Sequence, residues 1–252
     1  MKKENNKTTW GNVAGWYDEL LSGEDTYQTK VILPNILRLL MPTGKKVVDI
    51  ACGQGFFSKA LMDAGAQVVG VDISPNLIAI AQKNNSENLR FEVLPANNMT
   101  SLLNESFDDA ILILAVQNIK EMAETFKEAA RVLVKGGKFI IVLNHPCFRI
   151  PKESQWNFDE EKDVQYRRID KYNSSFSTEI DMNPGEKASL KKTVSFHRPL
   201  QDYFKALSSA GFVIVGLEEW ISHKKSENGP RARAENQARK EFPLFLTIIA
   251  EK

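Results

Sequence analysis

The sequence predicts an α/β domain built around a mostly parallel β-sheet. Short β-branched runs alternate with apolar stripes at helical spacing from residue 46 to residue 143. One run, residues 107–116, is almost uniformly apolar, as in a strand covered on both faces. Glycine turns separate several of these segments, beginning with CGQG at residues 52–55. Alternation of this kind is typical of parallel strands joined by right-handed helical crossovers.

The first half of the chain predicts five strands with helices between them. An N-terminal helix carries the apolar stripe of Val31, Ile32, Ile36 and Leu39 and ends at Pro42. Later helices begin near Phe56 and at Ser74-Pro75, a serine cap followed by proline. A helix near residues 119–133 is expected to close at Gly136-Gly137. The expected strands are residues 46–50, 67–73, 89–94, 107–116 and 138–143.

The second half departs from this rhythm and then resumes it. Residues 145–198 are too long for a simple loop, so we expect an inserted substrate cap. A helix ending at Gly211 and strands at 212–220 and 244–250 follow, the strands suiting an antiparallel pair. The charged stretch between them is expected to be a surface loop. We therefore expect one domain, with an N-terminal helical leader (1–44), a cofactor-binding core (45–144), the cap (145–198) and a C-terminal part (199–252).

Composition narrows the functional classes. The 252 residues carry a net charge of +1, which gives no global attraction for nucleic acid or an acidic membrane. The two cysteines have no paired spacing, so we expect neither a disulfide nor a metal site. A polar N-terminus and short apolar runs predict a cytoplasmic protein without a signal peptide or membrane span. The oligomeric state stays open.

The strongest local signal is the sequence VVDIACGQGFFS. Asp49 ends a strand, and Gly53 and Gly55 lie in the turn into a helix, where glycine lets a ligand approach the backbone. Asp72 ends the next strand, a position suited to binding ribose hydroxyls. A dinucleotide site would need a third glycine where Ser58 stands. Asp49 would repel a pyrophosphate and suits a cofactor with a positive amino group.

Five segments in order resemble the motifs of class I S-adenosylmethionine-dependent methyltransferases of the small-molecule, methyltransferase-11-like type. They are DIACGQGFFS, GVDIS, LPANNM, FDDAILILAVQNI and LVKGGKFII, within residues 45–143. The resemblance implies a Rossmann-like three-layer sandwich whose seven-stranded sheet has an antiparallel last strand. It also implies S-adenosylmethionine as cofactor and S-adenosylhomocysteine as product.

The resemblance also implies roles for individual residues. Asp49, Ala51, Gly53 and Gly55 would line the methionine and sugar side, and Asp72 would hold the ribose, with Ile73 on the adenine. The adenine edge would be formed by Asn97, Asn98 and Met99, and the methionine part would face Ala115 and Val116. The sequence departs from the family at Ala96-Asn97, where many relatives have an aspartate. An asparagine carbonyl would serve the same adenine amino group.

The segment GWYDELLSGEDTYQ resembles the tyrosine-bearing leader of small-molecule members, which folds over the cofactor. Tyr17 and Tyr27 would then contact the cofactor's carboxylate or sulfonium. The alternative is that Trp16 and Tyr17 are core aromatics of a packed helix.

The substrate side is expected at the carboxyl end of the fifth strand. His145 falls there and is a candidate general base, although a lone histidine is more often structural. Arg149 and Trp156 are cap candidates for substrate contact, together with Arg167 and Arg168. His197 and Arg198 are further candidates, but Arg198 would equally well pair with a cap acid such as Asp170.

The function predicted is methyl transfer to a small-molecule acceptor by in-line displacement at the methyl carbon. An RNA or protein methyltransferase is the alternative, and it predicts a strongly basic face that this sequence lacks; the excess of lysine and arginine in residues 223–241 is modest. A non-catalytic cofactor-binding partner protein is a third reading, and a dehydrogenase is a distant fourth.

Overall fold

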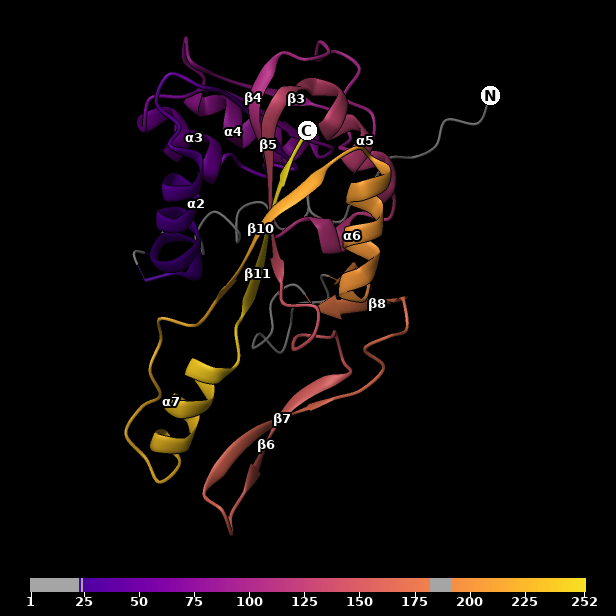
Figure 1. The fold of residues 1–252 in the computed structure, drawn as a ribbon. Helices are drawn as coiled ribbons and strands as arrows, with labels where there is room; N and C mark the ends of the chain where they lie inside the picture. The colour runs from indigo at the N-terminus through magenta and orange to yellow at the C-terminus, as the bar shows by residue number, and fades with distance from the viewer. Residues whose placement is uncertain (1–22, 24, 182–191) are drawn as a thin grey trace.

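A computed structural model describes residue 23, residues 25–181 and residues 192–252. Seven strands form one sheet in the order β10-β11-β5-β4-β1-β2-β3 (Figure 1). Their bounds are β1 Lys46–Ile50, β2 Gln67–Asp72, β3 Leu89–Val93, β4 Phe107–Ile113, β5 Leu133–Asn144, β10 Val213–Trp220 and β11 Phe245–Glu251. Strands β1 to β5 run parallel to one another, whereas β11 runs antiparallel to both β5 and β10. The Rossmann-like fold with an antiparallel last strand is thereby confirmed.

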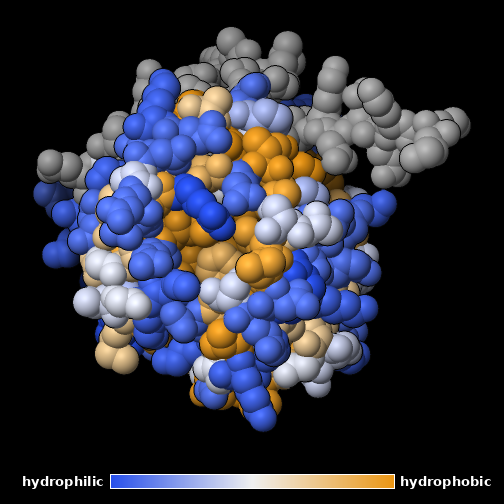
Figure 2. Space-filling view, turned by 90° about the horizontal axis from the view of Figure 1, so that it is seen from above, coloured by the Kyte–Doolittle hydropathy of each residue, from blue (hydrophilic) through white to orange (hydrophobic). Residues whose placement is uncertain are grey.

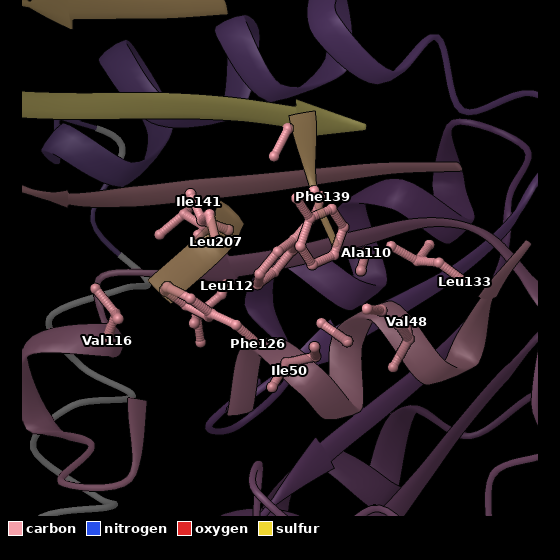
Figure 3. Close-up of a cluster of buried hydrophobic side chains, with 14 of the residues drawn as sticks. Val48, Ile50, Ala110, Leu112, Val116, Phe126, Leu133, Phe139, Ile141 and Leu207 are labelled. Atoms are coloured by element: carbon pink, nitrogen blue, oxygen red, sulfur yellow. The ribbon is translucent and has the colours of Figure 1, made fainter. Parts of the chain in front are cut away.

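The side chains of the buried strands alternate between two hydrophobic cores, one on each face of the sheet. Val48 and Ile50 of β1 face the layer of α5 (Met122–Val132) and α6 (Leu200–Ser209). Figure 3 shows this cluster, in which the Phe126 and Phe139 rings meet edge to face at 5.6 Å between centroids. Val47 faces the opposite layer, made by α2 (Leu33–Leu40), α3 (Phe56–Asp63) and α4 (Pro75–Ala81). Burial on both faces explains why these strands are continuously apolar.

Two element boundaries differ from those expected. Helix α5 ends at Val132 and passes directly into β5, so Gly136 and Gly137 lie inside a strand. The pairing of β5 with β4 shifts register there, and Gly136 has φ +80°. The glycines therefore form a strand irregularity rather than a helix end. Strand β4 also stops earlier than expected, because Leu114 turns the chain with φ +53° into the short helix η4 (Val116–Asn118).

The N-terminal helix is divided in two. A π-helical segment η2 (Gln28–Ile32) continues into α2, which ends where Met41 adopts φ +47° just before Pro42. Ser74 caps α4, accepting a hydrogen bond from the Leu77 amide, as its sequence predicted.

The region after β5 contains two β-hairpins. The first pairs β6 (Ser154–Asp159) with β7 (Val164–Ile169), and the second pairs β8 (Phe176–Asp181) with β9 (Lys192–His197). Figure 1 shows the β6–β7 hairpin projecting beyond the sheet, beside helix α7 (Ala232–Glu241). The expectation of a charged surface loop between the last two strands is wrong in part, because residues 232–241 form helix α7. Its Ala234 and Ala238 are buried four residues apart, a helical signal present in the sequence.

The basic excess of that stretch is matched by acids on the hairpin. Arg233 forms an ion pair with Asp163 at 2.6 Å, and Arg231 pairs with Glu160. The Arg231 guanidinium also lies 4.4 Å from the Phe158 ring centroid. These two arginines therefore link the start of α7 to the β6–β7 hairpin of the cap.

The surface seen from above in Figure 2 is mostly hydrophilic around a central hydrophobic area. Among the described residues, no helix combines the length and apolar character needed to cross a bilayer.

Candidate active site

A cavity of about 130 Å³ opens at the carboxyl ends of β1, β2 and β4. We call it the cofactor cavity. The sheet order reverses beside β1, and ligands of open α/β sheets bind at this kind of point. Its lining is apolar apart from one carboxylate and one amide and comprises Ala51, Gly53, Asp72, Ile73, Leu77, Ile113, Leu114, Ala115, Asn118 and Ile119. The five predicted cofactor residues that the structure brings together here are Ala51, Gly53, Asp72, Ile73 and Ala115.

Unusual backbone geometry shapes this cavity. Ala51 and Leu114 have φ of +56° and +53°, a region that costs a non-glycine residue roughly 1–3 kcal/mol. Gly53 and Gly55 have φ of +59° and +84°. A Cβ on Gly55 would also lie 2.5 Å from the Phe91 ring, so both conformation and space require glycine. Gly55 is thus needed for the turn itself, and it does not line the cavity.

Asp72 is the only carboxylate that lines the cofactor cavity within the described chain. One of its oxygens accepts the Gly53 amide hydrogen at 3.0 Å, and the other accepts from the Ser74 amide at 2.8 Å. Burial raises the pKa of Asp72, against the opposing effect of these two amides. The side chain is therefore fixed at the cavity wall, with acceptor capacity left for a ligand's hydroxyl groups.

Asp49 lies beneath the turn rather than in the cavity lining. It is 2% exposed, and its carboxylate accepts a hydrogen bond of 2.6 Å from Ser58, at the position where a dinucleotide site would have glycine. Burial, and then the negative charge of Asp72, raise the pKa of Asp49 to about 7, although the Ser58 hydroxyl opposes the shift. Two carboxylates around one turn, with no lysine or arginine in the lining, suit a cationic ligand and disfavour a pyrophosphate.

Other predicted cofactor residues lie elsewhere. Met99 and Val116 are fully buried in the core beside α5, which satisfies their apolar side chains without a ligand. Asn97 and Asn98 follow β3 but do not line the cavity. Tyr27 packs edge to face on His223 and Phe245, at 5.2 and 5.8 Å between centroids, as a packed aromatic residue would. Tyr17 lies outside the described residues.

A second cavity of about 380 Å³ adjoins the first, and we call it the acceptor cavity. It lies under the cap, and its described lining is polar for the most part, with two arginines and no carboxylate. The lining comprises Gln28, Leu114, Gln117, Asn118, Asn144, Arg149, Ile150, Pro151, Ser154, Arg167, Ile180 and Ser195. Arg149 was expected from the sequence, whereas Gln117, Asn118 and Asn144 were not singled out.

Leu114 and Asn118 line both cavities and form the partition between them. The Asn118 amide donates to the Val194 carbonyl of β9 at 3.0 Å. Arg198 donates to the carbonyls of Ile119 and Lys120 at 2.7 and 3.0 Å. Arg198 therefore links the cap to residues 119–120, which directly follow the partition; we call this segment the partition loop. The Arg198 guanidinium is used for these carbonyls and does not pair with Asp170, which pairs with Arg168.

The two cap histidines do not line either cavity. His145 is 2% exposed; its Nε2 lies 2.6 Å from a Glu219 oxygen, and its Nδ1 accepts from the Cys147 amide at 3.2 Å. Burial lowers the pKa of His145, with Glu219 opposing. His197 is also buried, and its Nε2 bonds the Tyr172 carbonyl at 2.8 Å. These contacts favour the structural alternative for His145 and His197 over a base or substrate contact.

Trp156 also lies outside the lining, but it contacts a residue within it. Its ring packs edge to face on Phe242 at 5.2 Å, and the Arg167 guanidinium lies 4.9 Å from its centroid. Trp156 is therefore placed to hold Arg167, which does line the acceptor cavity.

A third cavity of about 310 Å³ lies at the opposite edge of the sheet, near Lys46, Gln67, Leu89 and Phe107. These residues begin their strands, where open α/β sheets do not place their ligands. In the described ranges, no group of three or more histidine, cysteine or acidic residues is arranged to hold a metal ion.

Comparisons of the sequence and of the fold with known proteins both find methyltransferases. Residues 48–141 match the family model described as a methyltransferase domain. A demethylmenaquinone methyltransferase of Clavibacter sepedonicus is 29% identical over 141 residues, covering 52% of this chain and 57% of that protein. A ubiquinone biosynthesis O-methyltransferase of Idiomarina loihiensis is 30% identical over 105 residues, covering 40% and 43%. The chain thus matches about half the length of these relatives.

Among solved structures, an S-adenosylmethionine-dependent methyltransferase from Mesorhizobium loti aligns with a TM-score of 0.69 and 25% identity, over 92% of this chain and all of that one. A protein from Listeria monocytogenes described as a putative S-adenosylmethionine-dependent methyltransferase shares the fold, with a TM-score of 0.65 and 24% identity over 86% and 96% of the two chains.

Proposed function

We propose, from the match of residues 48–141 to the methyltransferase domain model, that this chain transfers a methyl group from S-adenosylmethionine to a small-molecule acceptor. The observation that carries the proposal is the pair of adjoining cavities at the carboxyl edge of the sheet. One suits the cofactor, the other lies beneath the cap, and only a partition separates them. A cytoplasmic setting and a single domain organised as leader, core, cap and C-terminal part belong to the same proposal.

The residues present fit the cofactor. Asp72 would bind the ribose hydroxyls, and the apolar side chains of Ile73 and Leu77 would contact the adenine. Asp49, in its ionised form beneath the turn, would favour the positive amino-acid part, and the positive charge would in turn favour that form. Ala51, Gly53 and Ala115 would line its path, while Gly55 would shape the turn. Tyr27, Met99 and Val116 would act through packing in the described arrangement, whereas Asn97, Asn98 and Tyr17 stay predictions.

When bound, S-adenosylmethionine supplies a methyl group on a cationic sulfur, which a nucleophile displaces in line to leave S-adenosylhomocysteine. The protein's own contribution would be alignment and exclusion of water. Leu114 and Asn118 would set the approach, since they face both ligands. The described lining of the acceptor cavity holds no histidine or carboxylate, so Gln117 and Asn144 would orient the nucleophile without acting as a general base.

The experiment is isothermal titration with S-adenosylhomocysteine. We expect binding by the wild-type chain and at least tenfold weaker binding by Asp72→Asn, the loss of about 1.4 kcal/mol of hydrogen bonding to a charged group. Asp63→Asn, which removes an exposed carboxylate on α3, is the matched control and should bind normally. Absence of binding by the wild-type chain would remove the basis of the proposal.

The alternative of an RNA or protein substrate finds less support. Two basic residues of the stretch 223–241, Arg231 and Arg233, form ion pairs with Glu160 and Asp163 of the cap. The acceptor cavity lies under the cap, and its described lining is mostly neutral, with two arginines among twelve residues, unlike a strongly basic nucleic-acid groove.

A further inference from the structure

The acceptor cavity contains an uncompensated pair of positive charges. Arg149 and Arg167 both line it, and no carboxylate of the described chain does. The guanidinium of Arg149 forms no hydrogen bond or ion pair with any residue in the described ranges. Its side chain is open to the cavity, yet the surrounding protein lowers its pKa by desolvation, with a smaller opposing effect from Tyr27. Desolvation, followed by repulsion from Arg149, also lowers the pKa of Arg167.

Arg167 is held rigidly where it lies. It donates from Nε to the Phe148 carbonyl and from a terminal nitrogen to Ser154 at 3.0 Å, and it stacks on Trp156. A guanidinium has five N–H donors, so hydrogens remain for a ligand. Two arginines together in a partly desolvated pocket are the usual arrangement for binding a carboxylate or phosphate.

Gln117 lines the same cavity and carries a buried amide oxygen that has no partner in the described chain. Its Nε2 donates to the Leu114 carbonyl at 2.8 Å, which identifies the other terminal atom as Oε1. That oxygen is buried and has no hydrogen-bond partner among the described residues. A buried acceptor without a partner is costly, and a donor on a ligand would satisfy it. Gln117 adjoins the partition through Leu114 and through its chain neighbour Asn118.

We infer that the acceptor is a compact molecule with an oxyanion, which Arg149 and Arg167 bind, and a hydroxyl or amine whose hydrogen Gln117 accepts. This inference rests on the proposed function, because it assigns the acceptor of the same site. It distinguishes the acceptor of this chain from demethylmenaquinone, which the name of the Clavibacter sepedonicus relative gives. The hydrogen-bond donor lies beside the partition and is the nucleophile, while the oxyanion is held by the cap. Its oxygen or nitrogen forms the bond to the methyl carbon as the sulfur–methyl bond breaks, S-adenosylhomocysteine leaves, and the proton of the nucleophile is released to water.

The test compares three probes of similar shape on protein saturated with S-adenosylhomocysteine: 4-hydroxybenzoate, 4-hydroxyphenyl phosphate and the neutral 4-hydroxybenzamide. Isothermal titration should show at least one anion binding ~10-fold or more tightly than the amide, the scale of a charge-assisted contact. The tighter of the two anions identifies the group as carboxylate or phosphate. Equal affinity for anions and amide, or no binding by either anion, would overturn the inference.

Variants assign the preference to the arginines. Arg149→Gln should weaken the preference for the anion severalfold, since Arg167 remains, and Arg149→Lys should weaken it less because the charge is kept. Arg168→Gln is the matched control. It also removes one arginine charge from the cap, but Arg168, the residue after Arg167 in β7, faces solvent and pairs with Asp170. Circular dichroism melting verifies that each variant is folded. An unchanged preference in Arg149→Gln contradicts the assignment.

The Gln117 contact has its own readout. Benzoate lacks the hydroxyl of 4-hydroxybenzoate, so the ratio of their affinities measures what the hydroxyl contributes. Gln117→Met should reduce that ratio by roughly 3–10-fold, the range for one neutral hydrogen bond, while leaving benzoate binding unchanged. An unaltered ratio would contradict this part.

The experiments distinguish a failure of the proposed methyltransferase function from a failure of the oxyanion inference. The preceding titration of S-adenosylhomocysteine decides the cofactor. The anion preference and its weakening in Arg149→Gln are binding measurements that require no turnover, and they can be repeated on protein without S-adenosylhomocysteine.

Discussion

Replacing Asp49 with asparagine should stabilise the protein at alkaline pH. The pKa of Asp49 rises from 3.8 to about 7 on folding, chiefly through burial. Between these values the folded state binds more protons than the unfolded state, so stability falls as pH rises through this window and levels off above about 7. The loss between pH 5 and pH 7 spans two pH units, or about 3 kcal/mol at 1.4 kcal/mol per unit. An asparagine at this site does not ionise, and its carbonyl can still accept from Ser58.

The assay is urea denaturation of the wild type and Asp49→Asn at pH 5 and pH 8. The stability advantage of the variant should be about 3 kcal/mol larger at pH 8 than at pH 5. Asp63→Asn, at an exposed position of α3, should show no comparable difference between the two pH values. An advantage of Asp49→Asn that is the same at both pH values would refute the reasoning, because the cost would then not come from ionisation.

Four further outcomes are expected. Asp49→Asn should weaken S-adenosylhomocysteine binding, and its deficit relative to wild type in isothermal titration should grow as pH rises through 7, since only an ionised Asp49 attracts the ligand's positive group; a deficit independent of pH would contradict this. Gly55→Ala should lower stability by more than ~1 kcal/mol in urea titration, because φ is +84° and the new Cβ would meet Phe91; a neutral effect would show that the turn tolerates a side chain. His145→Ala should lower the melting temperature and leave S-adenosylhomocysteine affinity unchanged, since its ring contacts Glu219 and Cys147 rather than a cavity; normal stability with impaired turnover would restore it as a base. Arg198→Met should weaken the binding of both the cofactor product and the probe anions severalfold by releasing the partition loop; unaltered affinity for both would leave Arg198 with a role in stability alone.

The sequence predicted the sheet and the cofactor cavity because both depend on local patterns. Runs such as VVDI and QVVGVD are strands by composition, and a turn with two glycines followed by an acid one strand later places its residues at one sheet edge. The errors arose where a pattern has two structural uses. Gly136-Gly137 ends a helix in many chains but forms a strand irregularity here, because Leu133 already pairs with Phe107 of β4 and the register shifts before Lys138 pairs with Asp109. The helix α7 was hidden by its charge, since only Ala234 and Ala238 are buried.

The acceptor cavity was less accessible to sequence reasoning because it depends on contacts between distant segments. Arg149 reaches it from the chain after β5 and Arg167 from a hairpin strand, whereas neighbouring Arg168 faces solvent. Successive side chains of a strand point to opposite faces, so Arg167 and Arg168 of β7 lie on opposite faces of the hairpin. The sequence alone did not predict this strand, and so it did not distinguish the two arginines. His145 and His197 drew attention through their chemistry, but in each case burial and hydrogen bonding account for the residue. Gln117 carries no motif and is recognised only by its unpartnered oxygen.

Because Leu114 and Asn118 line both cavities, a cofactor and an acceptor bound in them would contact the same two side chains, and we expect the two binding equilibria to be coupled. Whatever factor the acceptor applies to the dissociation constant of the cofactor, the cofactor must apply to that of the acceptor. A single titration of one ligand with and without the other therefore yields the coupling in both directions. The hydrogen bond from Asn118 to Val194 extends this linkage to the cap, so substitutions in β9, remote from either ligand, would alter the cooperativity between them.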